Sequence, residues 1–266
     1  MSNTSIAFVL AQSQYGSLIV NRFDYNHAFN GKIYGVGAQL LDTGSYDADE
    51  VEALQSVLVL LRKYRGDGIV ALDCGANIGV HTLNWAALMR GWGSVVAIEA
   101  QERIFYALAG NITLHNAFNA RALWAAVSDE EGLIDIPEPD YGKPGSFGSF
   151  ELKEQLGNEN IGQPIDYSRP RSRVRTMAID ASALDRADLI KLDIEGMELE
   201  ALSGAMTTIE ANRPVLFIET IKIDKRKLEK ILGELGYRFY PYGMSLLCIH
   251  VNDPIAGHIQ PGKKAV

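Results

Sequence analysis

The feature that most constrains the fold is residues 68–79, where a short apolar run ends in an acid and passes into a glycine-spaced turn. The run at 69–72 is continuous and too short for a helix, which is typical of a parallel strand covered on both faces. Asp73 closes this run, and Gly75 and Gly79 follow. We therefore predict a strand, a phosphate-style turn and a helix, with Asp73 at the sheet edge where ligands bind.

The glycine spacing of this turn narrows the choice of ligand. Gly75-x-x-x-Gly79 lacks the central glycine of the dinucleotide fingerprint, and the chain contains no G-x-x-x-x-G-K-[ST] pattern. The glycines let a ligand approach the backbone, and the following helix points free N–H groups toward it. Such a turn with an acid in front suits a ligand that carries an amine and a carboxylate, such as S-adenosylmethionine, better than a pyrophosphate.

A second acid lies at the end of the next apolar run. Residues 94–98 read as a strand, and Glu99 follows it after an interval that leaves room for one helix. A carboxylate at a strand tip can accept both hydrogen bonds of a ribose diol. Acids at strand ends are common without a ligand, but the combination with the glycine turn favours cofactor binding.

Composition and charge limit the class of protein. The 266 residues, 47% of them apolar, suffice for a sizeable core and favour one elaborated domain. The formal charge of −8 argues against nucleic acid or an anionic membrane as a partner. Cys74 and Cys248 match no disulfide framework or zinc spacing. The short apolar run at 6–11 has no basic leader and no window reaches membrane-helix length, so we expect a soluble, cytoplasmic protein.

The N-terminal part reads as a small appendage. Residues 1–45 contain strand-like pieces at 17–20 and 32–36 between Gly and Asn turns, and we predict a β appendage there. A helical pattern then runs from residue 47 to 65 and leads into the first strand. Gly44, Ser45 and Tyr46 precede this helix, where they either line the cofactor crevice or form a plain surface turn.

The alternation of helices and strands continues to residue 127. A helix is predicted from residue 102 to about 115, followed by a strand at 121–127. Ser128 and Asp129 follow the tip of this strand. If the ligand spans three strands, its adenine ring lies here, and we expect both residues to contact the cofactor.

Residues 129–178 break this alternation. The segment 140–150 is rich in Gly and Ser, and a polar loop leads to alternating arginines. An insertion of this length at the ligand edge usually carries specificity, so we predict a lid or a wall for the acceptor. The arginines share one face if the segment is extended, and they either bind an anionic acceptor or form a solvated edge that discourages strand addition. They are Arg169, Arg171, Arg173 and Arg175.

A second group of acids follows the insertion. The strand predicted at 188–192 ends at Asp193, with Glu195 close behind, and the strand at 214–218 delivers Glu219 to the same edge. Three carboxylates there can position and deprotonate a hydroxyl, or hold a hard cation such as Mg²⁺ through oxygen ligands. Asp193 and Glu219 are the expected ligands in the second case, and the sequence leaves both alternatives open.

The C-terminal part ends the sheet differently from a dehydrogenase. A helix is predicted at 225–235, then strands at 237–240 and 246–251, and a loose tail at 252–266. Two strands joined by so short a turn must be antiparallel. A dinucleotide dehydrogenase normally continues in parallel, so this hairpin counts against it.

Several segments in this order resemble the FkbM family of S-adenosylmethionine-dependent methyltransferases, over about residues 42–250. They are Asp73-Cys-Gly-Ala-Asn-Ile-Gly79, Ala126-Val-Ser-Asp129, Phe217-Ile-Glu219 and, most selectively, Ile190-Lys-Leu-Asp-Ile-Glu-Gly-Met-Glu198. The resemblance implies an α/β fold of class I (Rossmann-like), with a mostly parallel central sheet and a C-terminal antiparallel hairpin, over residues 46–251. It also implies O-methylation of a hydroxyl on a small molecule, commonly a sugar, glycoside or secondary metabolite.

The resemblance also assigns residues by position. The methionine end of the cofactor would be held by Asp73, Gly75, Asn77 and Gly79, and the ribose by Glu99. Asp193, Glu195 and Glu219 match the family's acidic positions.

For in-line transfer of the sulfonium methyl to an acceptor oxygen, the protein aligns the reactants and removes the hydroxyl proton. As the proton acceptor we consider Asp193, Glu195 and His81. His81 also fits as an ordinary residue of the helix that follows Gly79.

Two other classes of function remain open. An NAD-dependent oxidoreductase would also place glycines after the first strand and an acid after the second, but the missing central glycine counts against it. A non-catalytic cofactor-binding module would keep the fold without the chemistry, and the intact Asp73, Glu99 and Asp193 weigh against that. The identity of the hydroxyl acceptor and the oligomeric state do not follow from the sequence.

Overall fold

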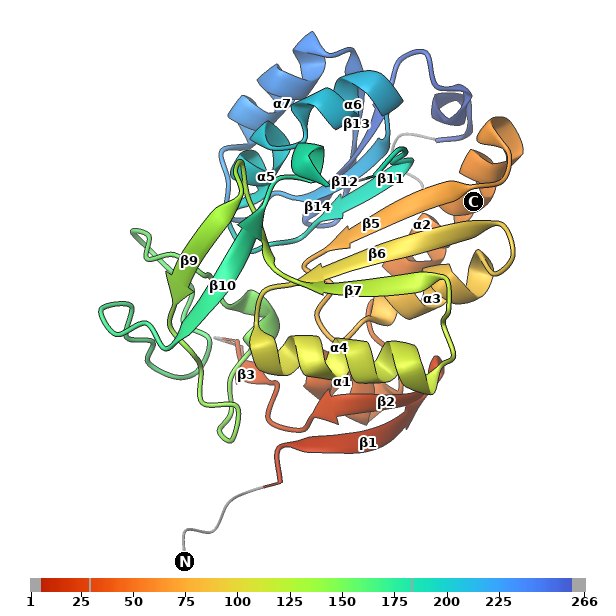
Figure 1. Ribbon diagram of the computed structural model, residues 1–266. Helices are drawn as coiled ribbons and strands as arrows, with labels where there is room; N and C mark the ends of the chain where they lie inside the picture. The colour runs from red at the N-terminus through yellow and green to blue at the C-terminus, as the bar shows by residue number, and fades with distance from the viewer. Residues whose placement is uncertain (1–5, 29, 183, 260–266) are drawn as a thin grey trace, which may run out of the picture.

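A seven-stranded sheet forms the centre of the molecule (Figure 1). The computed structural model describes residues 6–28, 30–182 and 184–259. The strand order is β13-β14-β12-β11-β5-β6-β7, in which neighbours from β12 to β7 pair in parallel and β14 is antiparallel to both of its neighbours. The strands are β5 (Ile69–Cys74), β6 (Gly93–Glu99), β7 (Ala120–Trp124), β11 (Leu189–Leu192), β12 (Val215–Glu219), β13 (Tyr237–Tyr242) and β14 (Ser245–His250). The predicted parallel sheet with an antiparallel terminal hairpin is confirmed.

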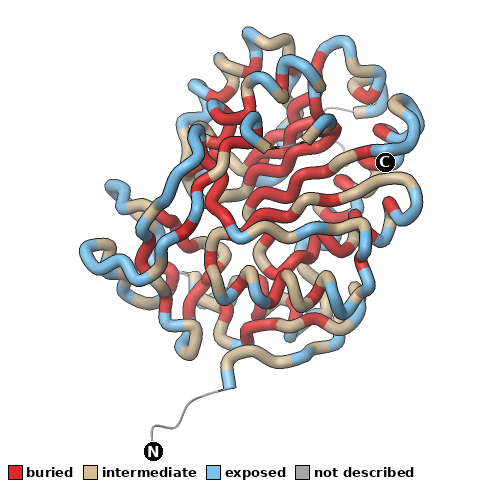
Figure 2. The backbone as a smooth tube through the Cα atoms, in the orientation of Figure 1, coloured by how far each residue is buried: buried red, intermediate tan, exposed pale blue. Residues whose placement is uncertain are grey.

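Helices cover both faces of this sheet because successive side chains of a strand point to opposite faces. In β5, Ile69 and Ala71 share a hydrophobic cluster with α2 and α3, whereas Leu72 and Cys74 lie in a second cluster with α5, α6 and α7. Figure 2 shows the buried strands between these two layers. The helices are α2 (Ala48–Arg65), α3 (Val80–Leu88), α4 (Glu102–Leu114), α5 (Glu198–Ser203), α6 (Met206–Asn212) and α7 (Lys225–Glu234).

The N-terminal segment shares the main core. An antiparallel hairpin of β1 (Phe8–Ser13) and β2 (Gly16–Asn21) packs through β2 against α4. Leu18 and Val20 lie in the same cluster as α2 and β5. Asn111 of α4 holds the hairpin, because its amide oxygen accepts the Ile19 N–H at 2.6 Å. The predicted domain boundary at residue 45 stays a prediction.

The strand predicted at 32–36 is wrong for most of its length. Only β4 (Ile33–Tyr34) pairs, with β3 (Asn26–His27), and the helix α1 (Val36–Thr43) begins at once. The helix is stabilised by the burial of Val36 and Leu40. Gly37 permits its close approach to the preceding loop, since a Cβ there would lie 2.2 Å from the Asn21 carbonyl oxygen.

The insertion carries a small sheet of its own. Its order is β8-β10-β9, formed by β8 (Ala126–Val127), β9 (Gly132–Ile136) and β10 (Ser172–Met177). Between β9 and β10 the chain forms the short 3₁₀ helix η1 (Phe147–Ser149), and η2 (Ile179–Ala181) follows β10. The insertion is therefore an ordered part of the molecule beside the ligand edge of the sheet (Figure 1).

The predicted loose tail is wrong for residues 252–259. The 3₁₀ helix η3 (Pro254–His258) buries Ile255 completely, and Arg65 lies 2.5 Å from Asp253. Residues 260–266 lie outside the described residues. Within the described ranges, no helix combines the length and hydropathy needed to cross a bilayer.

Candidate active site

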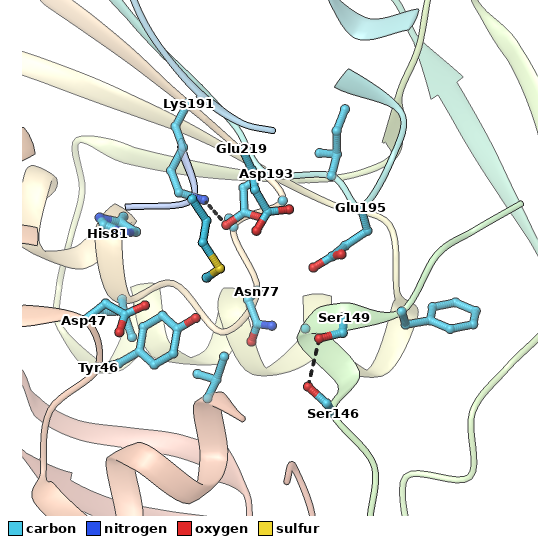
Figure 3. A pocket seen from close by; sticks show the side chains of 18 of the residues that line it. Tyr46, Asp47, Asn77, His81, Ser146, Ser149, Lys191, Asp193, Glu195 and Glu219 are labelled. Atoms are coloured by element: carbon cyan, nitrogen blue, oxygen red, sulfur yellow. Dashed lines mark hydrogen bonds and ion pairs between the residues drawn. The ribbon is translucent and has the colours of Figure 1, made fainter. Parts of the chain in front are cut away.

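A cavity of about 980 Å³ opens at the carboxyl ends of the central strands (Figure 3). Its floor is the turn after β5 together with the ends of β6, β11 and β12. Its other walls come from the N-terminal segment, the insertion and the terminal hairpin. The cavity thus lies where a parallel sheet offers its ligand edge.

The turn after β5 brings two backbone segments into contact. Gly75 lines the cavity with φ 77°, and a Cβ there would lie 1.8 Å from the carbonyl oxygen of Asp193. Asn77 also lines the cavity, in a left-handed conformation with φ 49° that its side chain supports by accepting the Ile78 N–H at 2.8 Å. The two motifs recognised in the sequence therefore meet at this point.

Asp73 and Gly79 do not line the cavity, although both are described residues. Asp73 is 1% exposed and accepts a 2.6 Å hydrogen bond from the Thr82 hydroxyl in α3. Gly79 starts α3 with φ 96°. Both residues shape the turn from behind the cavity lining, and their contact with the cofactor stays a prediction.

Glu99 lies at the cavity end of β6, as predicted. Its two oxygens accept the backbone N–H groups of Asn77 at 3.0 Å and Gln101 at 2.8 Å. Burial raises the pKa of this carboxyl to about 7. Each oxygen keeps a lone pair for a further donor such as a diol hydroxyl.

Ser128 and Asp129 were expected beside the adenine ring, and the structure places both described residues outside the cavity. The predicted strand ends early, at Trp124, and the chain turns into β8. The Ser128 N–H then bonds the Met177 carbonyl of β10 at 2.9 Å. Ala125 and Ala126 line the cavity in their place.

The N-terminal segment contributes more than the sequence indicated. Ser45 and Tyr46 line the cavity, which decides between the two alternatives left open for them. Burial raises the pKa of the Tyr46 phenol well above its ordinary value. Val36 and Gln39 of α1 also line it. They were missed because Val36 was read as the end of a strand and residues 37–43 were assigned to no element, and only the apolar spacing of Val36 and Leu40 signalled a helix.

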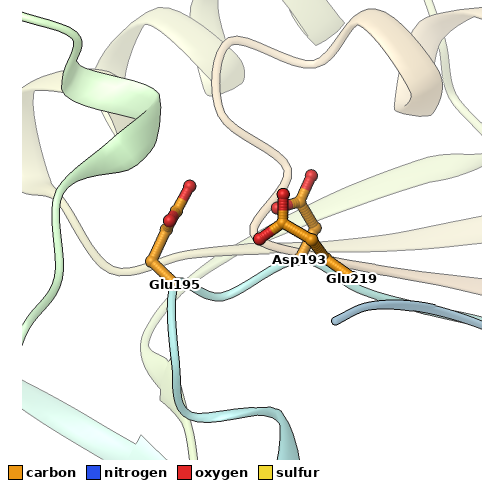
Figure 4. Close-up of side chains that lie close together, drawn as sticks. All are labelled: Asp193, Glu195 and Glu219. Carbon is orange, nitrogen blue, oxygen red and sulfur yellow. The ribbon is translucent and has the colours of Figure 1, made fainter. Parts of the chain in front are cut away.

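Three carboxylates meet at the other side of the cavity, as predicted (Figure 4). One oxygen from each of Asp193, Glu195 and Glu219 lies within 4.8 Å of the other two. Burial and the charge of Asp193 raise the pKa of Glu219 to about 8. The same two causes raise the pKa of Glu195 well above its ordinary value.

Lysines pair with two of these carboxylates. Lys191, only 3% exposed, places its ammonium 2.8 Å from Asp193 and 3.9 Å from Asp73. Lys222 lies 2.5 Å from Glu195. The side chain of Glu219 makes no hydrogen bond or ion pair with any residue that the structure describes, and Lys191 and Lys222 act on it only at longer range.

The expected Mg²⁺ site at Asp193 and Glu219 is tested by this donor set. Three oxygen donors suit a hard cation. However, the ammonium groups of Lys191 and Lys222 already lie within ion-pair distance of Asp193 and Glu195. Because resident cations take this place, the residues do not fit a divalent ion, and we assign it no step.

His81 lies at the cavity in the first turn of α3. Its Nε2 is 3.1 Å from a carboxylate oxygen of Glu50, and its ring packs against Trp85. The buried Nδ1 has no hydrogen-bond partner among the described residues. The imidazole is thus held in place and keeps one nitrogen free.

The four arginines of the insertion do not line the cavity in the part of the chain that the structure describes. Arg173 of β10 pairs with Asp135 of β9 at 2.6 Å, and Arg175 of β10 pairs at 2.5 Å with Glu131, which precedes β9. These side chains are well exposed. The structure supports the solvated-edge alternative over the anion-binding one.

The model of the methyltransferase FkbM domain matches residues 73–239. The chain belongs to the FkbM methyltransferase family. This membership and the strand order assign the class I methyltransferase fold, and the family uses S-adenosylmethionine as methyl donor. It argues against the oxidoreductase alternative. Comparison with curated proteins finds no match.

Solved methyltransferases are distant neighbours of this FkbM chain. Methyltransferase FkbM from Methylobacillus flagellatus KT is 18% identical with a TM-score of 0.48, covering 69% of this chain and 44% of that one. A SAM-dependent methyltransferase from Aquifex aeolicus is 15% identical (TM-score 0.39; 77% and 97% covered). A precorrin-6y C5,15-methyltransferase from Geobacter metallireducens GS-15 is 14% identical (TM-score 0.43; 85% and 92% covered). This chain thus spans less than half the length of the first neighbour.

Proposed function

We propose that this FkbM chain methylates a hydroxyl group of a small molecule, such as a sugar, glycoside or hydroxylated secondary metabolite. The observation that carries the proposal is one cavity in which the glycine turn and Glu99 face three carboxylates. Its volume of about 980 Å³ lies at the upper end of the range for small-molecule sites, so it suits a cofactor together with an acceptor.

The residues of the turn fit S-adenosylmethionine, which when bound supplies an electrophilic methyl group on a sulfonium. Glu99 offers free lone pairs to the ribose diol, and Gly75 lines the cavity in the turn that would hold the methionine end. Asn77 adds an amide group beside them. What remains for the protein is to hold the acceptor oxygen in line and to take its proton.

We propose that the acidic edge, formed by Asp193, Glu195 and Glu219, holds the acceptor oxygen in line and takes its proton. Asp193 and Glu195, two of the proton acceptors expected from the sequence, are each paired with a lysine. The third, His81, bonds Glu50 through Nε2, and its free Nδ1 is buried. Glu219 is not, and it lines the same cavity. We therefore place Glu219 as the residue that takes the hydroxyl proton, with Asp193 and Glu195 orienting the acceptor.

The test is calorimetric titration with S-adenosylmethionine, S-adenosylhomocysteine and NAD, followed by an acceptor screen. We expect binding of the first two alone, and release of S-adenosylhomocysteine with members of a panel of glycosides and hydroxylated metabolites. Binding of NAD alone would overturn the proposal. Cofactor binding without turnover of any panel member would favour the non-catalytic module.

A further inference from the structure

Lys222 makes an unusual number of contacts for one side chain. It lies in the loop after β12 and is 12% exposed. Its ammonium is 2.5 Å from Glu195, 3.2 Å from Glu159 and 3.4 Å from Glu151, and it donates a 2.9 Å hydrogen bond to the carbonyl of Ser149. One cation therefore serves three carboxylates and a carbonyl.

These partners come from two separate parts of the chain. Glu195 belongs to the acidic edge of the sheet, whereas Ser149, Glu151 and Glu159 belong to the insertion. Ser149 and Glu159 line the cavity themselves. Lys222 thus joins the cavity wall formed by the insertion to Glu195 at the acidic edge of the sheet.

Residues 151–159 of the insertion, the wall segment, are held together by hydrogen bonds to Glu151. The buried carboxylate of Glu151 accepts the Glu159 N–H at 2.8 Å and the Asn158 amide at 2.7 Å, which closes residues 151–159 into a compact loop. The loop also covers Gly196, where a Cβ would lie 3.2 Å from the Gln155 amide nitrogen. The Lys222 cluster is therefore one of the anchors of this loop, together with the buried Leu152 and the hydrogen bond from the Tyr34 hydroxyl to Glu159.

We propose that Lys222 is a positioning residue that fixes the insertion as the acceptor wall of the cavity. Without its ammonium, three partly or fully desolvated carboxylates would face one another, and like charges at such distances repel. The wall would move away from the edge, and Glu195 would lose the partner that orients it. The inference rests on the proposed function in that the cavity is taken as the acceptor site.

An exposed ion pair in the same insertion offers a matched control. Lys153 pairs with Glu200 of α5, so it also links the insertion to the sheet domain. The side chains of Lys153 and Glu200 are both more than one-third exposed. Lys153 has one carboxylate partner, whereas Lys222 has three. Exposed ion pairs of this kind contribute little to stability. Comparing the Lys153 and Lys222 variants therefore separates the effect of removing any lysine from the effect of breaking the buried cluster.

The test is hydrogen–deuterium exchange over residues 147–162 in the full chain and in Lys222→Met, Lys222→Arg and Lys153→Met. We expect exchange in Lys222→Met to rise by about tenfold or more, because local opening frees the amides bonded to Glu151. Lys222→Arg should stay within about threefold of the parent, since the charge is kept, and Lys153→Met should match the parent. Unchanged exchange in Lys222→Met, or equal effects of the two methionine variants, would overturn the proposal.

A second variant covers poor folding of Lys222→Met. Glu159→Gln keeps the lysine and removes one of its ion pairs with the insertion, and we expect exchange over the same residues to rise by about fivefold, beyond the range allowed for Lys222→Arg. An unchanged profile in this variant would count against the proposal in the same way.

Kinetics separate positioning from simple stabilisation. With any glycoside turned over in the screen, Lys222→Met should raise the acceptor KM by about tenfold and leave the affinity for S-adenosylmethionine unchanged, and Lys222→Arg should restore the KM. An unchanged KM would reduce Lys222 to a structural residue and overturn its positioning role. If the parent fails to bind S-adenosylmethionine, the proposed function fails, while the exchange experiment still decides what Lys222 holds.

Discussion

Single side chains explain the order of residues in the Lys-x-Asp-x-Glu-Gly-x-Glu segment. Lys191 compensates Asp193 from inside the sheet, and Glu195 adopts φ 57° to face the cavity. Glu198 closes the turn, because its buried carboxylate accepts the N–H groups of Ile194 and Gly196. Each polar residue of the segment therefore has a defined position.

Lys191→Met should be strongly destabilising. Burial opposes the charge of this lysine, yet Asp193 and Asp73 raise its pKa above the ordinary value. Removing the lysine leaves both carboxylates without this buried partner, and we expect the free energy of unfolding to fall by about 3–5 kcal/mol. Denaturant unfolding measures this, with Lys153→Met as a control that should lose about 1 kcal/mol or less. Equal losses would show that burial of the lysine is unimportant.

Glu99→Ala should abolish most S-adenosylmethionine binding. Two hydrogen bonds from a diol to a carboxylate contribute about 1.5–3 kcal/mol each, so affinity should fall by about a hundredfold or more. Calorimetry measures the affinity, and circular dichroism should show an unchanged spectrum. Glu130→Ala, an exposed acid outside the cavity, serves as the control. Unaltered binding would remove Glu99 from the site.

Glu219→Gln tests the proton acceptor. The amide keeps the shape of the side chain but cannot take a proton, so kcat should fall by about 10²–10⁴-fold. The affinity for S-adenosylmethionine should not change, because Glu219 lies across the cavity from Glu99. Rates close to those of the parent, measured as S-adenosylhomocysteine release, would return the role to Asp193, Glu195 or His81.

At the scale of elements, two segments far apart in the sequence cover the cavity together. The buried Asp24 accepts the Gly37 N–H of α1 at 3.1 Å and the Phe147 N–H of η1 at 3.0 Å. Gln101 adds a second link, since its amide donates to the Phe147 carbonyl at 2.8 Å. The N-terminal segment and the insertion are thereby joined over the cofactor turn.

This junction should make stability depend on pH. Burial raises the pKa of Asp24 to about 6 from an ordinary value of 3.8, so its contribution is fully present below pH 3.8 and is lost as pH rises through 6. Between pH 4 and 7 the free energy of unfolding should fall by about 2 kcal/mol more in the parent than in Asp24→Asn. Denaturant unfolding at both pH values measures the difference, and parallel pH profiles would contradict the assignment.

The sequence predicted what depends on local pattern and missed what depends on tertiary placement. The strands at 69–74 and 93–99 and the acids at their tips follow from short apolar runs, and all were found. Lys222 was not found, because its partners lie up to 73 positions away in the chain. The early end of β7 was missed because Ala125 and Ala126 continue the apolar pattern while the chain turns toward β10.

For the whole molecule, two of the three clustered carboxylates, Asp193 and Glu195, are paired with the chain's own cations. The net charge of −8 and the three clustered carboxylates favour attraction of metal ions, but Lys191 and Lys222 lie within ion-pair distance of two of them. Asp193 and Glu195 therefore each have a cation of the chain beside them, whereas Glu219 has none within ion-pair distance among the described residues.

Removal of metals should accordingly have no effect. After treatment with EDTA, the affinity for S-adenosylmethionine and the rate of methyl transfer should equal those of the untreated protein, and added Mg²⁺ should restore nothing. Calorimetry and S-adenosylhomocysteine release measure the two quantities. A rate that falls with EDTA and recovers with Mg²⁺ would establish the cation site that the lysines argue against.

The contact between Gly75 and the Asp193 carbonyl has a consequence for engineering. The turn at Gly75, on the cofactor side of the cavity, touches the backbone at Asp193, on the acceptor side. Because this contact is between backbone atoms, side-chain substitutions cannot change the distance between the two sides. Substrate preference must then diverge in the two segments that cover the cavity, residues 34–46 and 146–159. Their cavity-lining side chains can change while the contact between Gly75 and Asp193 stays the same. Libraries aimed at new acceptors should randomise cavity-lining positions within residues 146–159 and 34–46, while keeping Glu151, Glu159, Gly37 and the turns at Gly75 and Asp193.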